Sequence, residues 1–175
     1  MEERFRIGPA KKSTETQRKT LRQNMDKLMW VSRVSLKRRG GTPFTLKGRL
    51  VLPQGMESVE LVNEGFSFAV VEAFAEHMAI TDTAVLETIG VTGGTVARRR
   101  KEEAIKPDES DRFYRLARVT AMAERVLEHP AKARTWLMSK NRALGGRTPF
   151  SLMRNEPGIA MVEDALNRIE YGVYG

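Results

Sequence analysis

The side chains that most often carry chemistry are sparse in this sequence. It has no cysteine and two histidines, His77 and His129, which belong to no paired motif. Without cysteine there can be no disulfide, no thiolate nucleophile and no cysteine-ligated zinc site. Neither histidine has a nucleophile or an acid at the spacing of a catalytic motif, and a lone histidine on a helix is usually structural. The sequence therefore predicts a binding protein without metal or cofactor, and not an enzyme.

A short basic segment is the first candidate for binding. Thr92 is a candidate helix N-cap, and the helix expected after it carries four adjacent basic residues. In a helix-turn-helix motif the first turn of the second helix meets the base edges, but Gly93 and Gly94 occupy that turn and leave Thr95 to read a base. A solvated basic face is the alternative. The residues expected to bind DNA are Thr92, Thr95, Arg98, Arg99, Arg100 and Lys101.

A polar loop and the last five residues are the other candidates. The loop at residues 141–150 contains Gly145 and Gly146, and paired glycines let a backbone approach a partner closely. It lacks the spacing of a P-loop, and a tight connection between two helices is the alternative. Residues 171–175, YGVYG, follow an amphipathic helix. We expect their apolar side chains to dock on a partner, with a frayed end as the alternative.

The positive charge is concentrated at the N-terminus. The chain of 175 residues has a net charge of +8; residues 1–58 hold 14 Lys and Arg against 5 Asp and Glu, and the rest holds 16 against 17. One helix is expected at residues 14–36, and Trp30 with the basic residues 37–39 could lie on a nucleic-acid backbone. One alternative is that the arm is a solvated tail. Another is that translation of the natural protein starts at a methionine within the arm, for example at Met56.

After residue 59 the pattern is helical, and no strand pattern competes with it. Residues 67–78 have apolar side chains at helical spacing, and Thr81 is the N-cap of a second short helix that Gly90 ends. Two short helices joined by a glycine turn predict a helix-turn-helix. Pro107 starts the longest helix. Later helices are expected after His129, after Thr148, and from residue 157 to about residue 170. The expected buried stripe of the longest helix is Phe113, Leu116, Ala117, Thr120, Ala123 and Leu127.

Composition sets the remaining expectations. Hydrophobic residues make up 41% of the chain, which permits one modest core. No run approaches the roughly 18 apolar residues that a spanning helix needs, and the MEER start lacks the apolar segment of a secretory signal. We therefore expect a protein of the cytoplasm with no membrane partner.

Six motifs in sequence order resemble those of one family. They are PDESDR (107–112), RLARV (115–119), AKARTWL (131–137), NRALGGRTP (141–149), VEDAL (162–166) and RIEYGVY (168–174). From about residue 59 to residue 175 the chain is similar to antitoxins of the Xre/MbcA/ParS family, which pair with RES-domain toxins. The basic arm is not explained by this resemblance, and Gly93 and Gly94 stand where relatives tend to place longer polar residues.

The resemblance implies an all-α fold with an Xre-like helix-turn-helix domain and a small helical toxin-binding domain. We expect a basic arm at residues 1–58 that can be flexible, the helix-turn-helix at 59–105 and the toxin-binding helices at 106–175. The toxin would consume NAD or transfer ADP-ribose from it, and this chain would inhibit it. The antitoxin would also repress its own operon by binding operator DNA as a homodimer or with its toxin. A stand-alone DNA-binding regulator is the rival interpretation.

The toxin contacts are expected in the loop and the tail. The tail after Tyr171 can reach about 13 Å beyond the helix, which is enough to enter a small-molecule cleft. We expect it to plug the toxin's active site, with the terminal carboxylate of Gly175 near an arginine that would otherwise pair with an NAD phosphate. The residues expected to bind the toxin are Asn141, Arg142, Leu144, Gly145, Gly146, Tyr171, Gly172, Val173, Tyr174 and Gly175.

Overall fold

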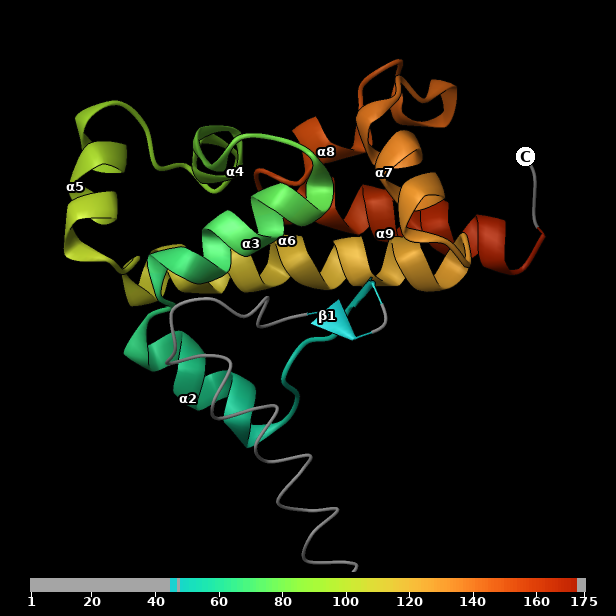
Figure 1. The fold of residues 1–175 in the computed structure, drawn as a ribbon. Helices are drawn as coiled ribbons and strands as arrows, with labels where there is room; N and C mark the ends of the chain where they lie inside the picture. The colour runs from blue at the N-terminus through green and yellow to red at the C-terminus, as the bar shows by residue number, and fades with distance from the viewer. Residues whose placement is uncertain (1–44, 47, 173–175) are drawn as a thin grey trace, which may run out of the picture.

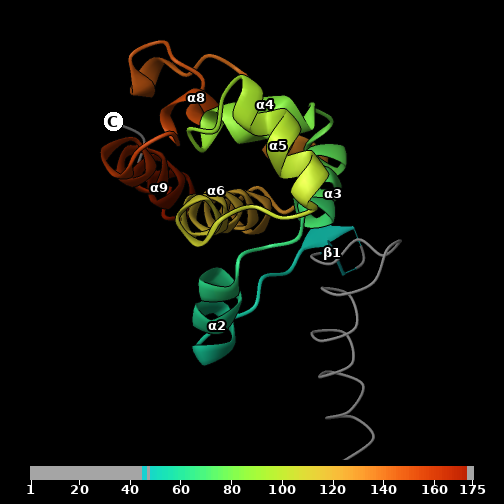
Figure 2. The same cartoon turned by 90° about the vertical axis from the view of Figure 1, so that its left-hand side faces the viewer.

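One long helix, α6 (Pro107–Val126), forms the centre of the molecule. The computed structural model describes residues 45, 46 and 48–172 of the chain. In Figure 1, α6 runs across the view with α2 below it and α3 and α4 above it, and Figure 2 looks along its axis. The helices α2, α7 and α9 and the strand β2 all contact α6. The core is therefore built around a single helix.

From α3 onward the α-helices follow one another in the predicted order, whereas the short hairpin, α2 and η1 were not among the expected elements. The described elements are β1 (Thr45–Leu46), β2 (Arg49–Leu50), α2 (Met56–Glu64), α3 (Phe68–Met78), α4 (Asp82–Thr88), α5 (Gly94–Glu102), α6, α7 (Pro130–Met138), the 3₁₀ helix η1 (Arg142–Leu144), α8 (Pro149–Leu152) and α9 (Glu156–Glu170). The two strands pair antiparallel. The expected mostly helical fold, a helix-turn-helix followed by further helices, is confirmed. None of the described helices is both long and apolar enough to cross a membrane.

Side chains cap the starts of several helices, and the predicted N-cap Thr81 is confirmed. The Thr81 hydroxyl accepts a hydrogen bond from the Ala84 N–H at 3.1 Å at the start of α4. At the start of α7, Nδ1 of His129 accepts from the Ala131 N–H at 3.1 Å. Each cap satisfies an N–H group that the first turn leaves unpaired. His129 therefore has a structural role.

The core confirms the predicted stripe on α6. Its predicted members are buried except Leu127, which is partly exposed. Phe113 lies at the centre, with its ring edge-to-face against Phe66 at 5.7 Å and against Phe74 at 5.3 Å between centroids. These contacts join α6 to α3 and to the segment before α3. Aromatic pairs in this geometry stabilise a core beyond the area they bury.

The N-terminal hairpin also belongs to this core. Leu50 is buried, and its N–H donates to Oε2 of Glu124 at 2.8 Å. The other oxygen of this buried carboxylate, Oε1, pairs with the His77 ring, so Glu124 joins β2, α6 and α3. The hydroxyl of Tyr114 donates to the Pro53 carbonyl at 2.8 Å.

The folded unit thus starts earlier than the expected end of the arm. Residue 58 falls inside α2, and the side chain of Leu50 packs in the core, so residues 49–58 do not form a separate arm. Charge counting missed this because a single buried leucine in a basic segment carries no periodic pattern. The helix expected at residues 14–36, with Trp30 and the basic residues 37–39, lies outside the described part of the chain. The division at residue 105 stays a prediction, as α6 follows it directly and shares one core with both sides.

Gly158→Ala is expected to lower the free energy of unfolding by about 2 kcal/mol, because the site has no room for a side chain. Gly158 lies in the first turn of α9, and a Cβ there would stand 1.9 Å from the carbonyl oxygen of Leu152. Gly94→Ala is the matched control, since an added Cβ at this helical glycine meets nothing within 4 Å. The control should be neutral or stabilise the protein by up to about 1 kcal/mol. Urea unfolding measures both, and equal midpoints would contradict the prediction.

Candidate functional site

The helix-turn-helix consists of α4, residues 89–93 and α5. Ile89 and Val91 bury their side chains and hold the turn on the core. Nε of Arg112, on α6, donates to the Ile89 carbonyl at 2.6 Å, and this hydrogen bond holds the turn against α6. As a result α5 stands at one end of the molecule, at the left of Figure 1 and toward the viewer in Figure 2.

The outer face of α5 carries three exposed basic residues. Arg98 and Arg100 expose more than half of their side chains, and Lys101 is also exposed. A guanidinium nitrogen of Arg100 lies 2.5 Å from Oδ2 of Asp82, and the group stacks over the Phe68 ring at 5.7 Å. The hydrogen bond from Arg100 lowers the pKa of the Asp82 carboxyl. These three cations form a basic surface on the helix-turn-helix that is suited to DNA phosphates.

Arg99 does not belong to this surface, and the prediction that it binds DNA is wrong. Its side chain is 2% exposed. Nε and a terminal nitrogen donate to the two carboxylate oxygens of Glu109 at 2.6 and 2.9 Å, and the other terminal nitrogen donates to Glu102 at 2.6 Å. The hydrogen bonds that Arg99 donates to Glu109 raise the pKa of Arg99 further above its already high value. This buried ion pair clamps α5 to the start of α6.

The first turn of α5 begins one residue later than predicted. The N-cap is Gly93, with φ +57°, and no side chain caps the helix, so the predicted N-cap role of Thr92 is wrong. The left-handed backbone at Gly93 is one that glycine adopts without steric cost. Thr92 is exposed and Thr95 is half-buried, so both lie beside the exposed cations at the entry to α5. Their DNA contacts stay predictions.

The polar loop is a closed structure around η1. The Asn141 N–H donates to the Arg147 carbonyl at 3.0 Å, and the Asn141 side chain accepts from the Ala143 N–H at 2.9 Å. Gly145 and Gly146 have φ of +67° and +75° and face open space, so they serve the turn and not a close approach within the chain. Leu144 is 4% exposed. Its predicted toxin contact is wrong for the side chain, which fills the core.

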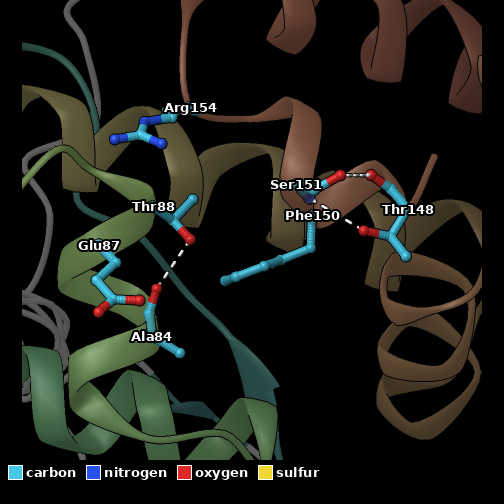
Figure 3. A pocket seen from close by; sticks show the side chains of 7 residues that line it. All are labelled: Ala84, Glu87, Thr88, Thr148, Phe150, Ser151 and Arg154. Carbon is cyan, nitrogen blue, oxygen red and sulfur yellow. Dashed lines mark hydrogen bonds between the residues drawn. The ribbon is translucent and has the colours of Figure 1, made fainter.

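A pocket that the sequence analysis did not predict lies between α4 and α8. It is open to solvent, has a volume of about 310 Å³ and is lined by Ala84, Glu87, Thr88, Thr148, Phe150, Ser151 and Arg154. Figure 3 shows the Phe150 ring extending between the two helices, with Arg154 on one side. The pocket therefore lies between the helix-turn-helix and the C-terminal helices.

Arg147 and Arg154 are also basic residues that the sequence analysis missed. Residues 129–155 contain six Lys and Arg and no Asp or Glu, and this acid-free run was the signal that could have identified them. Arg142, Arg147 and Arg154 are all exposed. Arg147 and Arg154, together with the predicted Arg142, place positive charge around η1 and α8.

The tail begins at the end of α9. Tyr171 is its C-cap and is 76% exposed, and its N–H donates to the Asn167 carbonyl at 3.0 Å. Gly172 has a φ of +67°, which is a left-handed backbone conformation that glycine adopts readily. Val173, Tyr174 and Gly175 lie outside the described residues. The toxin contacts expected of all five residues stay predictions.

Comparison with known proteins assigns two consecutive parts of the chain after residue 56. Residues 57–118 match the model of the antitoxin Xre-like helix-turn-helix domain. Residues 122–172 match the antitoxin Xre/MbcA/ParS C-terminal toxin-binding domain. The two matches meet within α6. This order of domains on a shared helix defines the class of toxin–antitoxin antitoxins.

Three curated relatives bear the name antitoxin Xre. The protein from Yersinia enterocolitica is 31% identical over 123 residues, which are 69% of this chain and 83% of that protein. The Pseudomonas putida protein is 37% identical over 79 residues, 45% of this chain and 49% of its own. The Photorhabdus laumondii protein is 28% identical over 115 residues, 65% and 78% of the two chains. The chain belongs to the Xre antitoxin family.

Proposed function

We propose that this chain neutralises a RES-domain toxin that consumes NAD or transfers ADP-ribose from it. The observation that carries the proposal is the toxin-binding domain at residues 122–172, which ends at the exposed Tyr171. An antitoxin can inhibit a toxin by covering its catalytic cleft. A C-terminal tail that begins at the exposed end of a rigid helix is suited to enter such a cleft. We therefore propose that the C-terminal region occludes the toxin's active site.

The attachment of α9 to α6 supports this mechanism. Three ion pairs join the two helices along their length: Arg115 with Glu156, Arg118 with Glu163 and Arg125 with Glu170. Such exposed pairs each contribute little stability, but they fix the direction in which α9 points. Buried Val162 and Leu166 complete the contact. A tail that starts from a fixed helix loses less conformational entropy when it binds.

We also propose that the antitoxin represses its own operon through α5, as a homodimer or in complex with its toxin. Arg98, Arg100 and Lys101 would contact phosphates, so binding is expected to weaken steeply as the salt concentration rises. Thr92 and Thr95 would supply a modest sequence preference. The rival function, a regulator without a toxin, predicts the same DNA binding and no partner for the C-terminal domain.

Co-expression with the toxin from the neighbouring gene tests the proposal. The whole chain is expected to restore growth and the cellular NAD level. Deletion of residues 172–175 should leave the fold and much of the complex intact but restore NAD consumption by the bound toxin, because the helical contacts remain while the cleft opens. The full-length variant Val173→Ser with Tyr174→Ser keeps the length of the tail but removes its apolar side chains. It shows whether inhibition depends on apolar contact or on the length of the tail.

Two outcomes count against it. If the truncated chain inhibits as fully as the whole chain at saturating concentration, the helices and not the tail occlude the site. If the whole chain neither binds the neighbouring gene product nor protects NAD, while operator DNA is still bound, the stand-alone regulator is the better description.

A further inference from the structure

We propose that Arg142, Arg147 and Arg154 form a docking surface for an acidic patch on the toxin. The proposal rests on the function proposed above and adds the chemistry by which the toxin is recognised. These charges lie around η1 and α8, apart from the tail that would occlude the active site. We call these three residues the arginine surface.

The arginine surface differs from the other arginines in the described part of the chain, because its side chains have no partner there. Among the described residues, none of its three guanidinium groups has a hydrogen bond or an ion pair. Every other arginine in that part of the chain pairs with a carboxylate or donates to a carbonyl. Unpaired arginines gathered in one segment are therefore an exception that the fold itself does not require.

The sequence keeps this charge unneutralised. No acidic residue occurs from residue 129 to residue 155, and Lys132 and Lys140 add to the positive charge of the segment. The helix that follows, α9, has the opposite balance, and its acids pair with arginines of α6. Since neighbouring acids are common on helix surfaces, their absence here leaves these arginines without a carboxylate nearby in the sequence.

The backbone holds the arginine surface in a defined shape. Arg142 and Arg147 lie on the loop that Asn141 closes by hydrogen bonds at both of its ends. Thr148, the next residue after Arg147, lines the same pocket as Arg154, so the loop continues into the pocket rim (Figure 3). The planar guanidinium presents its donors in a set geometry, so an arginine on such a backbone loses less entropy per hydrogen bond to a carboxylate than a lysine does.

The pocket gives the surface a place for a side chain. Phe150 supplies an apolar wall, and Arg154 supplies a charge beside it. Glu87 lies on the wall formed by α4 and is not paired with Arg154. A partner side chain with an apolar stem and a carboxylate would therefore be favoured at the α8 side and repelled at the α4 side. This asymmetry would fix the orientation of the bound toxin.

The position of the surface favours a protein over a nucleic acid. It lies within the residues that match the toxin-binding domain. The proposed DNA-binding helix α5 stands at one end of α6, whereas α7, which leads into the arginine loop, stands near the other (Figure 1). The view along α6 in Figure 2 likewise places α5 in front of the other helices. Two separate basic surfaces are consistent with two partners.

A charge-reversal pair tests the proposal in the full chain. Arg142→Glu with Arg147→Glu should slow association with the purified toxin of the neighbouring gene about tenfold at low ionic strength, because oppositely charged patches steer encounter. The difference should shrink toward high salt, where the charges are screened. Arg154→Glu alone should produce a smaller slowing, about threefold. Stopped-flow or surface-binding kinetics measure the rates, and circular dichroism checks the fold.

The matched control is Arg98→Glu with Lys101→Glu, which makes the same charge change on α5. It should weaken operator binding and leave toxin association nearly unchanged, while the loop pair should do the reverse. Equal slowing of toxin association by both pairs would show an effect of net charge and overturn the proposal. Weakened operator binding with normal toxin association in the loop pair would assign the surface to nucleic acid instead.

The test separates this proposal from the function on which it rests. If the unaltered chain binds the toxin and the loop pair binds at the same rate at every salt concentration, the docking surface is refuted and the antitoxin function stands. If the unaltered chain does not bind the toxin at all, both proposals fail.

Discussion

Glu109→Ala is expected to lower the free energy of unfolding by about 3–5 kcal/mol, which is typical when one partner of a buried ion pair is removed. The change would leave the Arg99 guanidinium, 2% exposed, without the two hydrogen bonds at 2.6 and 2.9 Å that it makes to this carboxylate. Glu102 would remain as a partner, but half of its own side chain is exposed. Because Arg99 lies on α5, this helix should loosen with the core.

Glu163→Ala is the matched control, since its partner Arg118 is about half exposed. This change should cost at most about 1 kcal/mol. The double change Arg99→Met with Glu109→Leu should recover much of the stability, because it removes both charges and fills the space. Urea unfolding measures all three variants. Similar losses for Glu109→Ala and Glu163→Ala would show that burial does not set the strength of the Arg99 pair.

The same ion pair gives a dependence on pH. Burial of Glu109 by itself raises the pKa of the carboxyl, but hydrogen bonds from Arg99 and from the Lys106 N–H outweigh this effect, so the pKa lies below its ordinary value of 4.5. A lowered pKa in the folded state means that the unfolded chain takes up the proton first as the pH falls. The contribution of Glu109 is therefore complete above about pH 4.5 and is lost below it. Native Glu109 should steepen acid unfolding relative to Glu109→Gln.

A chain that begins at Met56 is expected to be less stable than one that begins at Thr45 by about 3 kcal/mol. The shorter chain lacks Leu50, whose side chain is buried and whose N–H donates to Glu124 at 2.8 Å. Loss of the side chain removes apolar burial, and loss of the N–H leaves one oxygen of a buried carboxylate unsatisfied. Both effects act where β2, α3 and α6 meet. Thermal or urea unfolding of the two chains measures the difference.

Leu50→Ala in the full chain separates the two contributions. This variant keeps the N–H donor and should lose about 2 kcal/mol. Equal stability of the chains that begin at residues 45 and 56 would show that the hairpin contributes nothing to the fold. We expect residues 1–44 to be dispensable for inhibition, and a chain that begins at Thr45 tests this without removing the hairpin.

The sequence alone predicted the elements of this protein well. Pro107 and the acids after it, the cap at Thr81 and the spacing of apolar residues are local features, and local hydrogen bonds and helical periodicity decide them. The start of α9 was also predicted closely. The requirement for glycine at position 158 was not predicted, because the Leu152 carbonyl that excludes a side chain there belongs to a different helix.

Tertiary contacts decided which residues reach the surface. Arg98, Arg99 and Arg100 are equivalent as sequence, but a turn of 100° per residue points Arg99 to Glu109 and its neighbours to solvent. Leu144 and Leu50 were likewise assigned to a loop and an arm, whereas contacts distant in sequence bury both. Local pattern thus determined where most of the helices form, and packing between them determined which charges remain exposed. Burial is a property of the assembled core, and a linear pattern specifies it only where the periodicity is continuous.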